Sequence, residues 1–331
     1  MKKFLLCGID VGSKELVVAI DPGRGKVWEG VFPNTAAGHG TLVRRLTRTR
    51  NLARVRVEAT GIYLLDLALA LERADGIAVM VANPRATRDF ARAQLRRSKT
   101  DRTDAASLLA FVRRMDFAAW TPPRSAILAL RALSRRIQAL LVTRAQEKNR
   151  LHADPVTEAT PAAIRESIER HVEAIDTEID TLTAAALEHV RRDALLRTRF
   201  DHLLSIKGIA EANAVTIVAE LSVLPADMSA RQWVAHAGID PRHHESGTSA
   251  QAPGRVSKVG NRRLRAASFL PAMVAAQYEL RIRAYYQQLL ARGKKPMQAL
   301  VAVMRKLLHA IYGMFLHEAD LDGSKFSAGE A

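Results

Sequence analysis

The pattern of apolar positions changes character along the chain. In the first hundred residues, apolar or alternating runs are short, and Gly, Ser, Pro and Arg separate them, which is typical of strands. Five such runs occur, at residues 4–9, 15–20, 26–32, 55–60 and 78–83. Helical spacing appears at residues 38–50 and 63–74 and again after Pro84.

The order of these elements predicts a fold class. Three consecutive strands joined by short turns come first, and helices and strands then alternate. This is the order of an RNase H-like α/β sheet, and the preferred hand of strand crossovers limits the alternatives. We therefore predict an RNase H/RuvC-like α/β domain over residues 1–120.

The middle of the chain predicts a helical arm over residues 121–200. Residues 124–152 form one long amphipathic pattern, residues 164–192 form another, and DPVTEATP separates them. Two long amphipathic helices with a short break predict an antiparallel hairpin or coiled coil. The arm is either a solvated spacer or a surface that contacts protein or RNA.

A third, mostly helical domain is predicted over residues 201–318, followed by a tail at 319–331. Within it, residues 203–221 (LLSIKGIAEANAVTIVAEL) have a Lys-Gly turn between two helical patterns. The pattern fits a helix-hairpin-helix, whose turn, here Lys207 and Gly208, binds a phosphate without reading sequence. A plain helical hairpin is the other interpretation.

The charge points to a polyanionic partner. The chain of 331 residues carries 50 Lys and Arg against 34 Asp and Glu, a formal charge of +16. This excess favours nucleic acid first and an anionic membrane surface second. No membrane span is expected, because no run of 18 apolar residues occurs. The single cysteine, Cys7, excludes an internal disulfide and fits a reducing cytoplasm.

Acidic residues at the ends of the predicted strands suggest a metal site. Asp10 ends the first strand and Glu58 lies near the end of the fourth, which lies beside the first in an RNase H-like sheet. Asp101 and Asp104 are three residues apart on one face of a predicted helix. Taken singly, each acid is an ordinary cap or solvated charge. Together they fit Mg²⁺, and two such ions stabilise phosphoryl transfer.

A second candidate site is the stretch 238–276, a predicted long polar loop that leads into an apolar helix. Ser246 lies in this loop and is either a nucleophile or an inert serine. The residues before it, His243, His244 and Glu245, match no metal-ligand spacing, so a turn of solvated polar residues is predicted for them. Backbone N–H groups near Gly260 would favour phosphate. Five basic residues surround the helix start and are candidate nucleic-acid ligands: Arg255, Lys258, Arg262, Arg263 and Arg265.

Seven segments, in this order, resemble the transposases of the one-hundred-and-ten family of bacterial insertion sequences. They are GIDVGSKELVVAI, VEATGIYL, VANPRATRDFA, KTDRTDAASLLA, SIKGIA, AGIDPRHHESGTS and GRVSKVGNRRLR. The resemblance covers nearly the whole chain. It implies a RuvC-like DEDD domain, a coiled-coil segment and a C-terminal transposase domain with an essential serine.

What the resemblance implies about function is specific. The DEDD set falls on Asp10, Glu58, Asp101 and Asp104, with Mg²⁺ as cofactor, and the serine falls on Ser246. The implied enzyme is a bacterial, cytoplasmic DNA recombinase, associated with the nucleoid in use, that inserts and excises its element. Its implied partners are donor and target DNA, a structured bridge RNA as guide, and further copies of itself in a dimer or tetramer, with no membrane. His244 departs from the aromatic residue of many relatives, which puts a stacking role there in doubt.

Two other functions compete with this one. The first is a Mg²⁺-dependent, RuvC-type, structure-selective DNA endonuclease that forms no covalent intermediate. The second is a non-catalytic RNA- or DNA-binding protein that keeps the fold and uses only its charge. Replacing the carboxylates would leave the function of the binding protein untouched, which distinguishes it from the two enzymes. A covalent bond from DNA to Ser246 would distinguish the recombinase from the nuclease.

Overall fold

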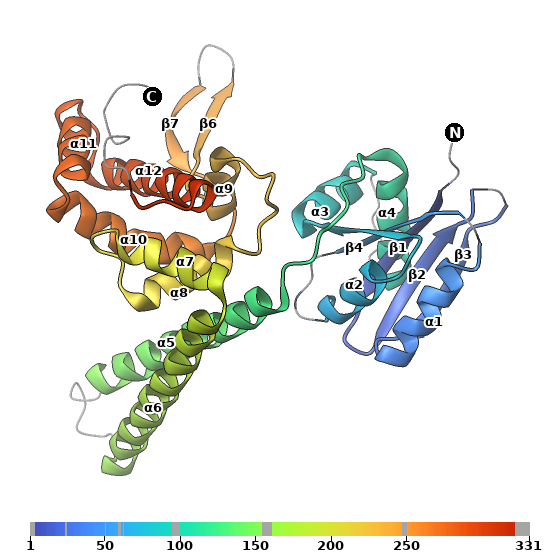
Figure 1. Cartoon of the computed structure of the whole chain (residues 1–331), viewed down its shortest axis with the longest axis horizontal. Coiled ribbons are helices and arrows are strands. Elements are labelled where there is room, and N and C mark those ends of the chain that lie inside the picture. The colour runs from blue at the N-terminus through green and yellow to red at the C-terminus, as the bar shows by residue number, and fades with distance from the viewer. Residues whose placement is uncertain are drawn as a thin grey trace. The chain divides into compact units, whose positions relative to one another are not determined.

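The computed structural model describes residues 4–23, 25–49, 51–58, 61, 63–94, 100–153, 161–246 and 250–321. The side chains of residues 243–254 lie outside this description. The chain divides into two compact units, Met1–Pro122 and Pro123–Ala331. Each is described by itself (Figure 1).

The first unit is built on a five-stranded mixed sheet in the order β3-β2-β1-β4-β5. Strands β1 to β3 form an antiparallel meander, and β4 and β5 continue the sheet parallel to β1. The strands are β1 (Leu5–Val11), β2 (Glu15–Asp21), β3 (Trp28–Pro33), β4 (Ala53–Glu58) and β5 (Ile77–Ala82). This order confirms the predicted RNase H/RuvC-like α/β class.

Helices cover both faces of this sheet. On one face, Cys7 and Ile9 of β1 share a core with helices α1 (Ala36–Leu46) and α2 (Leu65–Glu72). On the other, Val17 and Ala19 of β2 pack against α4 (Asp101–Arg114), and α3 (Pro84–Ala93) lies beside α4. Because both faces are buried, β1 and β2 read as nearly continuous apolar runs.

Gly8 of β1 sets how closely α4 approaches the sheet. A Cβ atom built on Gly8 would lie 2.5 Å from the Ala105 carbonyl oxygen and still closer to the Leu109 nitrogen. Both obstacles are backbone, which cannot rotate away as a side chain can. Glycine is therefore required at this position for the backbone of α4 to lie directly against β1, two residues before Asp10.

Gly8→Ala is expected to destabilise the protein. The added methyl must push α4 off the sheet, and overpacking of this kind costs about 1–3 kcal/mol. Urea denaturation of the full chain measures this change. Gly40→Ala is the matched control, because the nearest atom to its new Cβ is Arg44 Nη1 at 3.8 Å and alanine favours a helix. Equal stability of the two variants would contradict the close approach of α4.

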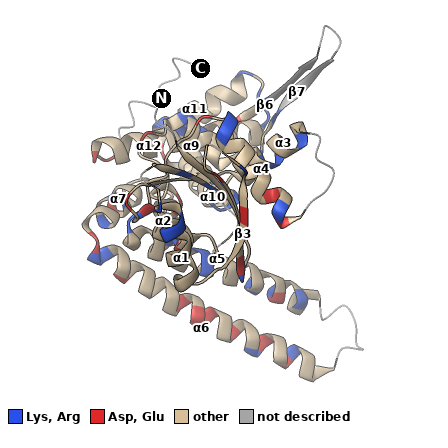
Figure 2. Ribbon diagram, turned by 90° about the vertical axis from the view of Figure 1, so that its right-hand side faces the viewer, with Lys and Arg blue, Asp and Glu red and all other residues tan. Residues whose placement is uncertain are grey.

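The second unit begins with a two-helix arm, α5 (Ser125–Ala153) and α6 (Ala162–Arg192). Ion pairs show that the two helices are antiparallel: Arg124 with Asp193 at 2.6 Å, Arg136 with Glu178 at 2.9 Å. This agrees with the predicted hairpin. Acidic and basic residues are interspersed along α6 (Figure 2), so this helix offers no continuous basic face to a phosphate backbone.

The rest of the second unit is a helical domain that shares one core with the base of the arm, since Ile127 and Leu130 of α5 belong to it. A two-stranded hairpin leaves this core. The helices are α7 (Ala194–Leu204), α8 (Glu211–Leu221), α9 (Ala230–Ala237), α10 (Arg262–Tyr278), α11 (Leu280–Ala291) and α12 (Pro296–His317), and the strands are β6 (Pro241–Ser246) and β7 (Ala250–Val256).

Helix α12 is long and apolar enough to cross a membrane by length and composition alone. In this structure it is a core helix instead. Its buried side chains, among them Val303, Leu307 and Ile311, pack in the core of the second unit, and Trp233 of α9 makes edge-on ring contacts with Tyr312 and Phe315. Its apolar composition is therefore accounted for by packing.

Candidate functional site

Two of the predicted carboxylates lie side by side at one edge of the first unit's sheet. Asp10 is near the end of β1 and Glu58 is the last residue of β4, and the two strands are parallel. Ile9 pairs with Val57, so Asp10 and Glu58 occupy the next equivalent positions. Both side chains are half-buried and face the side of the sheet that α4 covers, because they alternate with core residues of the opposite face.

The other two carboxylates lie in the first turn of α4. Thr100 caps this helix: its hydroxyl accepts from the Thr103 N–H at 3.2 Å, and the Thr103 hydroxyl accepts from the Thr100 N–H at 2.8 Å. Asp101 is exposed and Asp104 is half-buried. Negative charge in the first turn is favourable to any helix, so this interaction alone does not imply a site.

The electrostatics of Glu58 connect the strands to the helix. Burial raises the pKa of Glu58 above its usual value, and the negative charges of Asp10 and Asp104 raise it further. The cations Arg56 and Arg88 act in the opposite direction. Asp10, Glu58 and Asp104 therefore lie within each other's field, whereas Asp101 is exposed at the helix start.

The donor set suits a divalent metal, although the side chains do not form a ligand cage. Within the described part of the chain, no group of three or more His, Cys, Asp or Glu side chains is close enough to hold a metal ion. Burial, and after it the nearby charges of Asp10 and Asp104, raise the pKa of Glu58, and a cation bound among these carboxylates would favour their ionised forms. Carboxylate oxygens are what hard divalent cations prefer, so the residues fit such an ion.

Sequence reasoning missed Arg56, a fully buried arginine two residues before Glu58 on β4. Its guanidinium stacks on the Phe111 ring and donates from Nη2 to the Thr87 hydroxyl at 2.9 Å, while Nε and Nη1 have no hydrogen-bond partner among the residues that the structure describes. Desolvation lowers the pKa of Arg56 to about 10. The positive charge favours the ionised form of Glu58. The signal in the sequence was the position of Arg56 between Val55 and Val57, which face the core.

The second candidate site lies on the hairpin of the second unit, where the predicted polar loop is in fact two strands. Ser246 ends β6 and pairs with Ala250 of β7, beyond which the turn 247–249 lies outside the described residues. The ladder is irregular between Arg242 and His244. The prediction of a loop was wrong, and so was the prediction of a polar turn at His243, His244 and Glu245. These residues form strands that pair through their backbones, and such strands give no hydrophobic pattern in the sequence when they lack an apolar face.

The basic segment after the hairpin is partly used by the fold itself. Arg255, Lys258 and Arg262 are exposed, whereas Arg263 is half-buried and Arg265 donates from Nη1 to the Ala237 carbonyl at 2.8 Å. Exposure keeps the first three free to meet a phosphate. Arg265 instead helps to end α9, so its predicted contact with nucleic acid competes with a structural bond.

The backbone at the start of α10 also has structural partners. The Asn261 side chain accepts from the Arg263 and Leu264 N–H groups, at 3.0 and 3.2 Å. A Cβ on Gly260, whose φ is +149°, would meet the His236 carbonyl oxygen. Gly260 is therefore needed for the contact with α9, and two N–H groups expected to bind phosphate are already capped.

The predicted Lys-Gly turn joins α7 to α8. Lys207 is exposed there, and Gly208 adopts a left-handed φ of +102°. A Cβ on Gly208 would lie 2.8 Å from Val274 Cβ of α10. The glycine thus has a packing role, and both the helix-hairpin-helix and the plain hairpin remain predictions.

Sequence reasoning also missed a buried charge network at Glu220 of α8, which is completely inaccessible to solvent. Its carboxylate accepts from Arg135 Nε at 2.8 Å and from Arg131 Nε at 3.3 Å, both on α5, and from Asn261 Nδ2 at 2.8 Å. These contacts hold the pKa of Glu220 below its usual value despite burial. The network ties the base of the arm to the start of α10.

Two family matches cover most of the chain, the first extending from the first unit through α5 and the second lying in the helical domain of the second unit. Residues 7–154 match a family described as "Transposase", a DEDD type, and residues 200–287 match "Transposase IS116/IS110/IS902 family". The chain is similar to the "Pilin gene-inverting protein" of Moraxella bovis, with 24% identity over 80% of this chain and 81% of that protein. An uncharacterized protein of insertion element IS110 from Streptomyces coelicolor is 28% identical over 38% of this chain and 31% of its own.

Among solved structures, RuvC of T. thermophilus, in complex with a Holliday junction substrate, aligns with 35% of this chain and 99% of its own. The alignment has a TM-score of 0.28 and 16% identity.

Proposed function

Because this chain belongs to the IS110 family of transposases and acts on DNA, we propose that it is an RNA-guided recombinase that inserts and excises its element through a phosphoserine intermediate. The family matches support the transposase activity. The guide RNA, the covalent step and the roles of individual residues are our proposal.

The observation that carries the proposal is the placement of Asp10 and Glu58 at neighbouring positions of the paired strands β1 and β4, on the face of the sheet that α4 covers with Asp104 in its first turn. Carboxylates that repel each other at the ends of two strands and a helix start are suited to Mg²⁺, with Asp101 completing the set. Bound there, Mg²⁺ would polarise a phosphodiester and stabilise the charge that develops in phosphoryl transfer. Asp10, Glu58, Asp101 and Asp104 would hold it.

Ser246 is the proposed nucleophile. Its Oγ bonds to a DNA phosphorus, the bond from phosphorus to one deoxyribose oxygen breaks, and that oxygen takes up a proton as the serine loses its own. A strand-end hydroxyl then attacks the phosphoserine, which reseals the DNA and restores the serine. The phosphodiester energy is conserved in the covalent bond, so the cycle needs no nucleotide cofactor. The base that takes the serine proton is not assigned.

Basic residues are the proposed contacts to nucleic acid. Lys207, Arg255, Lys258 and Arg262 are exposed on the second unit, and the chain carries a formal charge of +16. Arg263, Arg265 and Gly208 belong to the same proposed surface. Donor and target DNA and a structured bridge RNA are the partners, and a dimer or tetramer would supply a serine and a carboxylate set from different copies.

The alternative is a Mg²⁺-dependent, RuvC-type endonuclease without a covalent intermediate. It is favoured by one observation, that all four carboxylates belong to the first unit, which contains the five-stranded sheet. Water activated by the metal would then be the nucleophile, and the second unit would only bind DNA.

RNA guidance is tested by purifying the protein from its host and sequencing the RNA that accompanies it. We expect one discrete structured RNA, bound with an affinity that falls steeply with salt, because basic side chains displace counterions from phosphates. Recombination in vitro should stop after nuclease digestion of the RNA and return when that RNA is added. Recovery of random fragments together with full activity after digestion would rule guidance out.

A further inference from the structure

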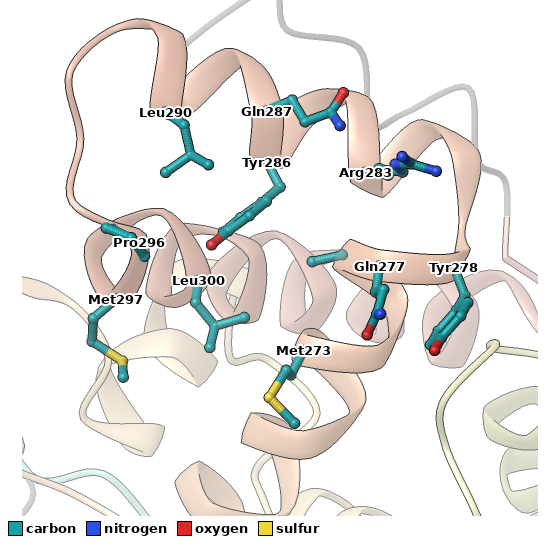
Figure 3. A pocket seen from close by; sticks show the side chains of 11 residues that line it. Met273, Gln277, Tyr278, Arg283, Tyr286, Gln287, Leu290, Pro296, Met297 and Leu300 are labelled. Atoms are coloured by element: carbon teal, nitrogen blue, oxygen red, sulfur yellow. The ribbon is translucent and has the colours of Figure 1, made fainter.

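The helical end of the second unit contains a pocket that the proposed chemistry does not use. It has a volume of about 690 Å³ and lies between the end of α10, helix α11 and the start of α12 (Figure 3). Pockets of this size are typical of sites for small organic groups. It belongs to one compact unit, so its shape does not depend on how the two units are arranged.

The lining combines aromatic rings, amides and an apolar floor. Tyr286 projects from α11 toward Pro296 and Leu300, while Tyr278 and Gln277 stand at the opposite end of the pocket (Figure 3). Tyr278 is 57% exposed and Met297 is 58% exposed, a high exposure for large apolar surfaces. Exposed tyrosine faces flanked by amides can both stack on a planar group and hydrogen-bond to its edge.

One wall of this pocket belongs to a basic stretch of the chain. Arg283 lines the pocket, and four more exposed cations lie within or next to α11: Arg281, Arg292, Lys294 and Lys295. The one acid among residues 279–295, Glu279, is used as the cap of α11, where its carboxylate accepts from the Ile282 N–H at 2.7 Å. These cations would add no binding energy for an apolar peptide segment, whereas they would attract a polyanion.

We propose that this pocket binds an unpaired nucleobase of a single-stranded segment, an inference that rests on the proposed nucleic-acid-processing function. The base stacks on Tyr278, Gln277 hydrogen-bonds to its edge, and Arg283 with the exposed cations near it on α11 holds the flanking phosphates. Stacking on aromatic side chains with cations along the backbone is how single strands are bound without a fixed sequence. The single strand is either RNA or DNA, which offer the same base and phosphate chemistry.

The test uses the full-length protein and a short single strand that contains one 2-aminopurine, whose fluorescence falls when it stacks. Tyr278→Ala is the variant, because Tyr278 is exposed and its removal leaves the core intact. We expect its affinity for the single strand to fall about five- to 100-fold and the quenching to disappear. Tyr278→Phe keeps the ring and should bind within about twofold of the wild type. RNA and DNA versions of the strand identify the source.

Two controls keep this test separate from the proposed function. Affinity for a duplex of the same sequence should not change in Tyr278→Ala, because paired bases cannot enter the pocket. Leu316→Ala removes a comparably exposed apolar side chain (60%) elsewhere on α12 and should bind as the wild type does.

Unchanged single-strand affinity in Tyr278→Ala, or equal losses for duplex and single strand, would overturn the inference and leave the recombinase proposal standing. A changed oligomer size with normal quenching would instead assign the pocket to a second copy. If the wild-type protein binds no nucleic acid, both the base-binding pocket and the recombinase function are contradicted.

Discussion

Ser246→Ala is expected to abolish recombination while leaving the fold intact. Alanine has no atom that can attack phosphorus, so no covalent intermediate forms. Ser246 is the last residue of β6, and removal of a single oxygen there should change the free energy of unfolding by no more than about 0.5 kcal/mol. Metal and RNA binding should match the wild type.

The measurement is a trapped reaction followed by peptide mapping. Wild-type protein should carry DNA covalently attached to the peptide that contains Ser246, and the alanine variant should carry none. Ser249→Ala, three residues later in the sequence, is the matched control and should form the adduct at the normal rate. Cleavage by Ser246→Ala at the wild-type rate would mean that water is the nucleophile, and the endonuclease alternative would be correct.

Asp104→Asn is expected to lower recombination by orders of magnitude. The substitution keeps the volume of the side chain and removes one of the charges that would hold Mg²⁺, so metal affinity should fall. Calorimetric titration with Mg²⁺ and a recombination assay measure the two losses. Asp116→Asn, which removes an exposed carboxylate just after α4, should leave both unchanged. Normal recombination by Asp104→Asn would exclude the carboxylates from the mechanism.

The same variant should remain folded without metal. The raised pKa of Glu58 means that its stabilising contribution is complete below the ordinary carboxyl pKa and is lost as the pH rises through the folded value. Asp104 is one of the charges that raise this pKa. Its removal therefore reduces this loss, which offsets the favourable charge–dipole interaction lost from the first turn of α4, so the metal-free variant should stay folded at neutral pH.

The sheet could be predicted from the sequence because its signals are local. Each strand of the first unit is an apolar run with Gly, Pro or Arg at its ends, and the observed strands agree with the predicted ones within a few residues. The pairing of β1 with β4 follows from the fold class, and this pairing brings Asp10 beside Glu58. The sequence also placed the start of α4 near Thr100 and Thr103, and the structure assigns the cap to Thr100.

The features that were missed depend on partners far apart in the chain. Gly8 needs α4, about a hundred residues later, before its role is visible. Glu220 draws its partners from α5 and from Asn261, so an acid in an apolar helix gave no hint of them. The β6–β7 hairpin has no alternating apolar face, since it leaves the core, and hydrophobic periodicity therefore fails there.

The buried Glu220 network has a mechanical consequence. Glu220 is fully buried while Arg131 and Arg135 are partly exposed, so separating the arm from α10 would leave a buried carboxylate without its partners, which is unfavourable. The 29-residue α5 is therefore coupled to the start of α10 through the Glu220 carboxylate, and the two move as one rigid element. A twist applied at the far tip of the arm would be delivered to the first turn of α10 and the strand that precedes it, rather than being absorbed by a hinge.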